Sequence, residues 1–195
     1  MWVAIGMVLA GLTLLFYYRN RQTTAIEKID EAVKQNKTLF TEQDAKNALA
    51  VVASKYGKTL AAQIEKVARL ETAHFTSKQY KLTGTGGMEA HGSAPYYGWY
   101  SPFFVANPSY TPVGTTDMLE NTGASQIGGN PQSSSAKIFV IMPSVEAWMM
   151  FLADYAQRNA DNGGILRWYS TQTAQQQIYA NSLKNISTPI TNNLA

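Results

Sequence analysis

The sequence predicts a mainly α fold of the α+β type, in which helices surround a loop-rich middle lobe with little β structure, after one N-terminal transmembrane helix. Three observations lead to this prediction. Apolar residues recur at helical spacing within 41–75 and 145–186. Most of the 14 glycines and five of the seven prolines fall within 82–136, which excludes one long helix there. The run 1–18 is apolar and carries no charged side chain.

The composition excludes several classes of protein and of functional site. The 195 residues suffice for one modest domain with accessory segments, and 45% hydrophobic residues exclude a disordered chain. The absence of cysteine excludes a disulfide framework and a cysteine nucleophile. A net charge of +3 suits an anionic surface such as a cell wall or a membrane, and is too small for a nucleic-acid-binding footprint. With only two histidines, His74 and His91, we expect no metal site and no cofactor.

The run 1–18 predicts a membrane anchor, because about 18 helical residues span roughly 27 Å, close to the hydrocarbon thickness of a bilayer. Tyr17 and Tyr18 lie where an interfacial aromatic belt is expected. Arg19 and Arg21 follow the apolar run, whereas a cleaved signal peptide has its basic residues before it. Two arginines bias the following domain only weakly towards the cytoplasmic side, so the membrane side stays open.

Residues 19–40 are predicted to form a juxtamembrane helix or stalk. Within it, Thr24 and Glu27 have the spacing of a capping box that would open a mostly solvated helix over 24–36.

Two further helices are expected next. Thr41 is the predicted cap of a helix through 45–55, which Gly57 ends in the manner of a left-handed cap. Thr59 starts the next helix, whose helical pattern continues to Phe75.

After the middle lobe, the apolar run 137–142 predicts a short strand. Ser144 is a good N-cap for a helix that runs to Asn159. A last helix is expected over 173–185, and the tail 189–195 is expected to be frayed.

Glu71 is the most informative polar residue. It follows Ile64, Val67 and Ala68 by seven, four and three positions, so it shares their buried helix face. Burial disfavours the ionised carboxylate and should raise its pKa, as a general acid for glycosidic cleavage requires. The alternative is a glutamate that reaches solvent or pairs with a neighbouring basic residue.

The stretch RLETAHFTS, followed by GTGGME, resembles the signature of lytic transglycosylases in the lysozyme superfamily. That family has a catalytic Glu followed by Ser or Thr and then an aromatic, and after a fixed interval a Gly-Leu-Met-Gln-type turn. Glu71-Thr72 and Phe75 correspond to the first part, and 86–89, Gly-Gly-Met-Glu, to the second. The aromatic comes one residue late, and the turn has Gly for Leu and Glu for Gln.

The C-terminal half resembles the related bacterial and phage glucosaminidase family through FVIMPSVEAWMMF, RWYST and the Tyr-Ala-x-x-Leu pattern at Tyr179–Leu183. Together the two resemblances imply a lysozyme-like catalytic domain over 41–188. They also imply cleavage of the β-1,4 glycosidic bonds of peptidoglycan, of lytic transglycosylase or N-acetylglucosaminidase type.

The resemblance implies roles for particular residues. Glu71 would protonate the bridging oxygen as an oxocarbenium-like centre develops. A two-carboxylate glycosidase needs a second acid, for which Glu89, Asp117 and Glu120 are the candidates in the middle lobe. A transglycosylase needs only one carboxylate, so the choice stays open. Tyr169 corresponds to the tyrosine that assists in the glucosaminidase family.

Substrate contacts are expected from the aromatic cluster at 96–104, because flat sugar faces stack on such rings. Tyr97, Trp99 and Tyr100 are the candidates, with Met88 in the signature turn. The alternative for the cluster is packing onto the helical core.

The sequence thus predicts a membrane-anchored, peptidoglycan-degrading enzyme for phage entry or lysis, with a bacterial wall-remodelling enzyme as a related reading. Its partners would be glycan strands, the bilayer through 1–18, and virion or capsid proteins, in a virion internal membrane or the bacterial cytoplasmic membrane. The alternative is a catalytically inactive, membrane-anchored structural or glycan-binding virion protein on the same scaffold. A metal-dependent hydrolase using His74 and His91 is disfavoured.

Overall fold

The computed structural model describes residues 20, 23–25, 27–32, 35, 37–88, 101–116 and 139–194. The predicted transmembrane segment 1–18 lies outside these residues. Within the described ranges, no helix combines the length and the apolar character needed to cross a bilayer.

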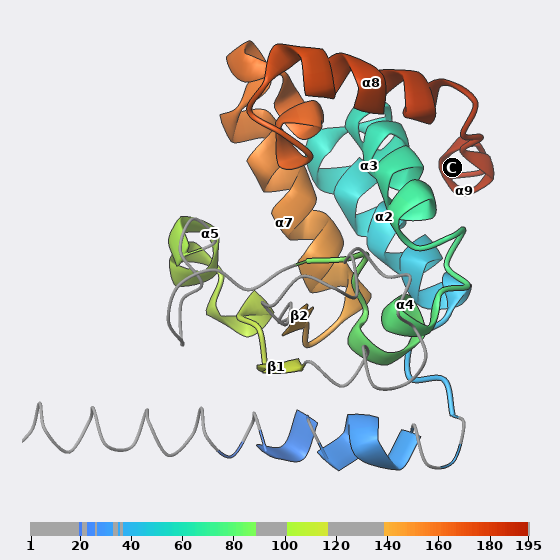
Figure 1. Ribbon diagram of the computed structural model, residues 1–195, viewed down its shortest axis with the longest axis vertical. Coiled ribbons are helices and arrows are strands. Elements are labelled where there is room, and N and C mark those ends of the chain that lie inside the picture. Colours follow the sequence, from blue (N-terminus) through green and yellow to red (C-terminus); the bar gives the residue numbers. More distant parts are fainter. Residues whose placement is uncertain are drawn as a thin grey trace, which may run out of the picture.

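The described part of the chain is mainly helical, as predicted (Figure 1). Three helices form its centre: α2 (Glu42–Tyr56) packs against both α3 (Lys58–Glu71) and α7 (Val145–Arg158). In Figure 1, α8 (Thr173–Lys184) lies across one end of these helices, and the small β structure lies at the other end.

The predicted start of α2 is confirmed. Thr41 accepts a hydrogen bond from the Asp44 amide, while the Asp44 carboxylate accepts one from the Thr41 amide at 2.7 Å, which completes a capping box. Gly57 ends the helix as predicted, but its φ of 89° and ψ of 154° lie outside the left-handed helical region that was expected. The α2 residues buried in the core are Ala45, Ala48, Leu49 and Val52.

Helix α3 ends at Glu71, four residues before the predicted end. Ala73, His74 and Phe75 follow with φ of 47°, 57° and 65°. This left-handed turn costs about 1–2 kcal/mol per residue, and it stops the helix immediately after the glutamate. The Thr72 hydroxyl stabilises the turn by accepting a hydrogen bond from the Phe75 amide at 2.8 Å.

A short helix that the sequence did not predict, α4 (Lys78–Thr83), follows this turn. The Ser77 side chain caps it, and Gly84 ends it with φ 72°, in the left-handed conformation that glycine adopts readily.

The middle lobe contains α5 (Ser101–Ala106), the 3₁₀ turn η2 (Pro108–Tyr110) and strand β1 (Gly114–Thr116). Strand β1 pairs antiparallel with β2 (Phe139–Ile141), so the strand predicted at 137–142 is confirmed. Strand β1 agrees with the short strands expected in the middle lobe, whereas helix α5 was not expected there. Its two phenylalanines, Phe103 and Phe104, are buried against Phe151, so these members of the aromatic cluster belong to the core.

The predicted N-cap of α7 is confirmed, because the Ser144 hydroxyl accepts from the Ala147 amide at 3.1 Å. After α7 the chain forms two 3₁₀ segments, η3 (Ala160–Asn162) and η4 (Gly164–Trp168), before α8.

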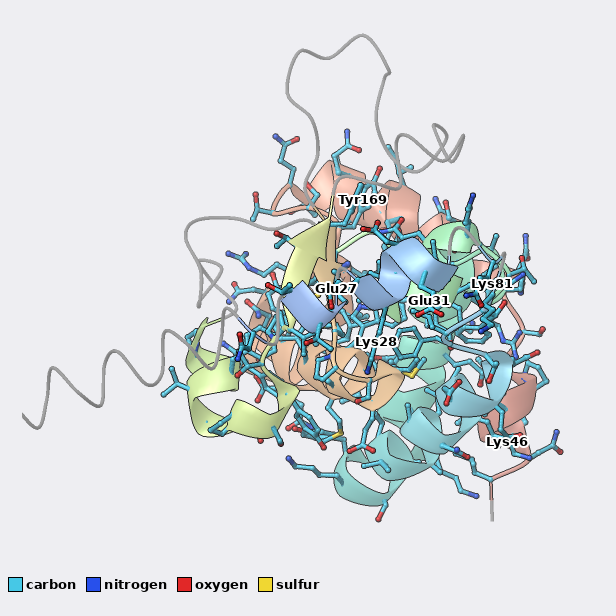
Figure 2. The ribbon with its side chains drawn as sticks, turned by 90° about the horizontal axis from the view of Figure 1, so that it is seen from below. Glu27, Lys28, Glu31, Lys46, Lys81 and Tyr169 are labelled. Atoms are coloured by element: carbon cyan, nitrogen blue, oxygen red, sulfur yellow. The ribbon has the colours of Figure 1, made fainter. Side chains whose placement is uncertain are left out.

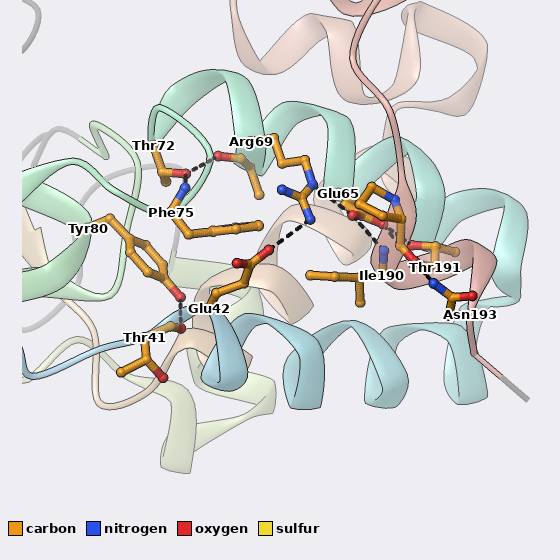
Figure 3. A network of polar contacts seen from close by, with 12 residues as sticks. Thr41, Glu42, Glu65, Arg69, Thr72, Phe75, Tyr80, Ile190, Thr191 and Asn193 are labelled. Atoms are coloured by element: carbon orange, nitrogen blue, oxygen red, sulfur yellow. Dashed lines mark hydrogen bonds and ion pairs between the residues drawn. The ribbon is translucent and has the colours of Figure 1, made fainter.

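The tail is not frayed as predicted. It forms a one-turn helix, α9 (Pro189–Asn192), held by the fully buried carboxylate of Glu65 (Figure 3). This carboxylate accepts hydrogen bonds from the Ile190 amide and from the amide and hydroxyl of Thr191. It also pairs with Arg69 at 2.8 Å, so the buried charge is compensated.

The N-terminal helical residues also differ from the prediction. The Thr24 hydroxyl donates to the Asn20 carbonyl at 2.9 Å, so Thr24 lies within a helix and is not its N-cap. Ile29 and Ala32 are almost fully buried, and Ala32 clusters with Leu82. This segment therefore packs on the domain and is less solvated than expected.

Candidate active site

Glu71 and Tyr179 form the centre of the candidate site. Glu71 is the last residue of α3, is half-buried, and its Oε1 accepts a hydrogen bond of 2.5 Å from the Tyr179 hydroxyl on α8. The nearby cation Arg69 does not pair with Glu71 in this structure. It bridges Glu65 and Glu42 instead, at 2.8 and 3.0 Å.

Burial raises the pKa of Glu71, and the hydrogen bond from Tyr179 lowers it by a smaller amount. The predicted rise is therefore confirmed. Burial and the adjacent Glu71 charge raise the pKa of Tyr179 far above its usual range. The phenol consequently keeps its proton and acts as the donor.

The glycine-rich turn packs directly on Glu71. A Cβ on Gly86 would lie 2.6 Å from the Glu71 Cβ and 3.0 Å from the Thr72 methyl group, so the close approach requires glycine. Gly87 has φ 76°, which favours glycine as well. The structure thus brings together the two halves of the predicted signature, which are 15 residues apart in sequence.

Met88 does not have its predicted place on a substrate-binding surface. Its side chain is fully buried in the core, and its carbonyl accepts from the Val140 amide at 2.9 Å. The residue anchors the glycine turn to strand β2.

Tyr169 reaches the site through Tyr179. Their rings stack in parallel, with centroids 4.5 Å apart and planes 2° from each other. Tyr169 is 52% exposed, and Figure 2 shows it beside α8. Its ring therefore covers one face of the Tyr179 ring and leaves its own outer face accessible.

A pocket of about 630 Å³ lies beside Tyr169, and neither Glu71 nor Tyr179 lines it. Two arginines, Arg158 and Arg167, line it together with the aromatic rings of Tyr155 and Trp168. Its size is within the usual range for small-molecule sites. Arg158 already pairs with Asp154 at 2.6 Å, so Arg167 is the cation of this lining that suits a ligand carboxylate. The aromatic rings suit the flat apolar faces of a ligand.

Sequence reasoning missed the role of Tyr179. The residue belongs to the Tyr-Ala-x-x-Leu pattern, but that pattern does not say which side chain the tyrosine contacts. Only the packing of α8 against α3 places its hydroxyl on Glu71, 108 residues away.

The other predicted site residues fall outside the described part. This holds for the candidate second acids and for the candidate aromatic contacts: Glu89, Asp117, Glu120, Tyr97, Trp99 and Tyr100. His91 also lies outside, and His74 is exposed in the left-handed turn. Among the residues that the structure does describe, no group of three or more His, Cys, Asp or Glu could hold a metal ion.

Comparison with models of known families, with curated proteins and with solved structures finds no match to this chain.

Proposed function

We propose that this chain is a membrane-anchored enzyme that cleaves β-1,4 glycosidic bonds of peptidoglycan, with Glu71 as the general acid. The observation that carries the proposal is the half-buried Glu71 carboxyl, whose pKa is raised and which a tyrosine and a glycine turn hold in place. A carboxyl whose pKa is raised keeps its proton to higher pH than an ordinary glutamate, so it can give that proton to the oxygen between two sugars.

The hydrogen bond from Tyr179 gives the two carboxyl oxygens of Glu71 different roles. Because the Tyr179 hydroxyl donates to Oε1, that oxygen acts as an acceptor, and the acidic proton resides on Oε2. When the proton leaves for the glycosidic oxygen, the negative charge that forms on Glu71 is stabilised by the phenol already in place. Tyr179 thus favours the product of the proton transfer without moving.

The pocket beside Tyr169 supports a peptidoglycan substrate. N-acetylated sugars offer flat faces to Tyr169, and the peptide carboxylates of the wall are complementary to Arg167. The anchor at 1–18 would hold the enzyme at a bilayer during phage entry or lysis.

The test is release of muropeptides from purified sacculi by the full chain and by Glu71→Gln. The variant keeps an acceptor for Tyr179 but has no acidic proton, so we expect at least about a 100-fold loss of activity. Glu31→Gln, an exposed glutamate on the N-terminal helical segment, is the matched control and should retain activity.

The products distinguish the reaction types by mass spectrometry. Anhydro-muramic ends indicate a transglycosylase, and reducing N-acetylglucosamine ends a glucosaminidase. Equal release by the wild type and Glu71→Gln would refute Glu71 as the acid. No release by the wild type would favour an inactive glycan-binding or structural protein.

A further inference from the structure

An apolar pocket of about 570 Å³ lies between the N-terminal helical segment and the domain. Ile29 of the helical segment lines it, together with Leu39 and Phe40 from the stretch that follows the segment. The domain contributes further apolar side chains: Leu82, Val113 and Ile141. Asn20 also lines it, so the pocket lies where the chain leaves the predicted membrane anchor. None of the residues that contact Glu71 lines it.

A second pocket, of about 340 Å³, is basic. Three lysines line it, Lys37, Lys78 and Lys81, together with the hydroxyl-bearing Thr38 and Thr76. The Thr76 hydroxyl already donates to the Ala73 carbonyl, so the ammonium groups are the donors that suit a phosphate group.

The two pockets share a wall. Leu82 lines both, and the helical segment passes from the first pocket at Ile29 to the second at Ala32, one turn later. Residues 37–40 also line both pockets, with Leu39 and Phe40 in the apolar pocket and Lys37 in the basic one.

The residues that line the two pockets differ in charge from other residues on this face of the protein. Among the described residues that line them, none is acidic. Glu31, which Figure 2 shows on the same face as Lys81, lines neither pocket, and its carboxylate accepts from the Gln35 side chain at 2.8 Å.

We infer that the two pockets together bind one anionic phospholipid of the bilayer. Its phosphate would lie among Lys37, Lys78 and Lys81, and an acyl chain would lie in the apolar pocket. Adjacent apolar and cationic pockets match the two chemistries of such a molecule, and the site lies at the point where the chain emerges from its predicted anchor. The lipid would fix the orientation of the domain relative to the membrane. This inference is independent of the reaction proposed at Glu71.

The experiment uses the full chain in neutral detergent with dioctanoyl phosphatidylglycerol, and native mass spectrometry to measure the bound fraction. Dioctanoyl phosphatidylcholine and inorganic phosphate serve as comparison probes. We expect the anionic lipid to bind more tightly than either, and its binding to weaken as salt is raised. Equal binding of phosphatidylcholine, or binding of inorganic phosphate as tight as that of the lipid, would overturn the inference.

Variants locate the binding. The triple change Lys37→Gln, Lys78→Gln and Lys81→Gln should weaken anionic lipid binding roughly 10- to 100-fold, since each lysine near an anionic lipid strengthens binding by up to about fivefold. The control removes the same charge from exposed lysines elsewhere: Lys46→Gln, Lys55→Gln and Lys184→Gln. An equal loss in both variants would show a non-specific charge effect and overturn the proposed site.

The apolar pocket is tested separately. Leu39 is 39% exposed, so Leu39→Glu perturbs folding little but places a charge on the pocket wall. We expect it to weaken lipid binding, whereas Val51→Glu on the exposed side of α2 should not. If the triple lysine variant does not fold, the comparison of Leu39→Glu with Val51→Glu and the salt dependence test the proposed lipid site. Unchanged lipid binding in Leu39→Glu would refute the acyl-chain pocket. Activity on sacculi is measured in parallel, and the two proposals can fail independently.

Discussion

Replacing Tyr179 with phenylalanine isolates the hydrogen bond to Glu71. The change removes the hydroxyl that lies 2.5 Å from Oε1 and keeps the ring that stacks on Tyr169. Because the phenol lowers the pKa of Glu71, its loss should raise that pKa further. The carboxyl becomes a weaker acid, and the charge that forms on it during proton transfer loses its stabilising donor.

The magnitude follows from the value of a hydrogen bond to a charged group, about 1.5–3 kcal/mol. If the whole of this stabilisation is lost in the transition state, kcat/KM falls roughly 10- to 100-fold. The assay is the pH dependence of muropeptide release. Activity requires protonated Glu71, so it declines as pH rises through the pKa, and this alkaline limb should move to higher pH in Tyr179→Phe.

The matched control is Tyr110→Phe, because the Tyr110 hydroxyl also donates to a glutamate, Glu146, away from the candidate site. This variant should leave the alkaline limb in place and retain activity. An alkaline limb of Tyr179→Phe that is unchanged or moved to lower pH would refute the argument. Equal losses in the two variants would attribute the effect to stability and not to the acid.

Four further predictions concern stability, measured by urea denaturation. Gly86→Ala places a Cβ 2.6 Å from the Glu71 Cβ and should cost about 1–3 kcal/mol; a smaller cost would mean that the turn yields easily. Glu65→Gln leaves the buried Arg69 poorly compensated and should cost about 3–5 kcal/mol. Glu42→Gln should cost less than about 1 kcal/mol, because the Glu42 side chain is 58% exposed; similar costs for the two variants would contradict the network in Figure 3. His74→Gly relieves a φ of 57° and should stabilise the protein by about 0.5–1 kcal/mol; destabilisation would show that the turn is not strained. Finally, folding raises the pKa of Glu71 above 4.5, so the folded state binds more protons and stability falls as pH rises from 4.5 through the raised pKa. Glu71→Gln should weaken this slope, and an unchanged slope would exclude Glu71 as its source.

Local signals in the sequence were sufficient for several elements. The caps at Thr41 and Ser144 were predicted because a capping residue lies within three positions of the amide it satisfies. The strand at 139–141 was predicted from its apolar run. Local rules failed at α5, where prolines indicated a loop. Pro102 occupies the first turn, where proline is tolerated, and burial of the two phenylalanines stabilises the helix.

Long-range contacts determine the structure of the C-terminal tail. Nothing in the local sequence predicts that Pro189–Asn192 is ordered, because its stabilising partner, the Glu65 carboxylate, is 125 residues away from Ile190. Likewise, the end of α3 at Glu71 depends on a left-handed turn of three non-glycine residues, which sequence patterns do not favour.

For the candidate site, the sequence by itself determined that Glu71 lies on a buried helix face, because helical periodicity sets which side chains share a face. It also determined that a glycine-rich segment follows, with Gly86 15 residues after Glu71. Only the tertiary structure decided that this turn contacts Glu71 and that Tyr179 holds its Oε1. The physical reason is that a hydrogen bond and a close backbone approach depend on how helices pack in space, and residues 108 positions apart carry no mutual signal in their spacing.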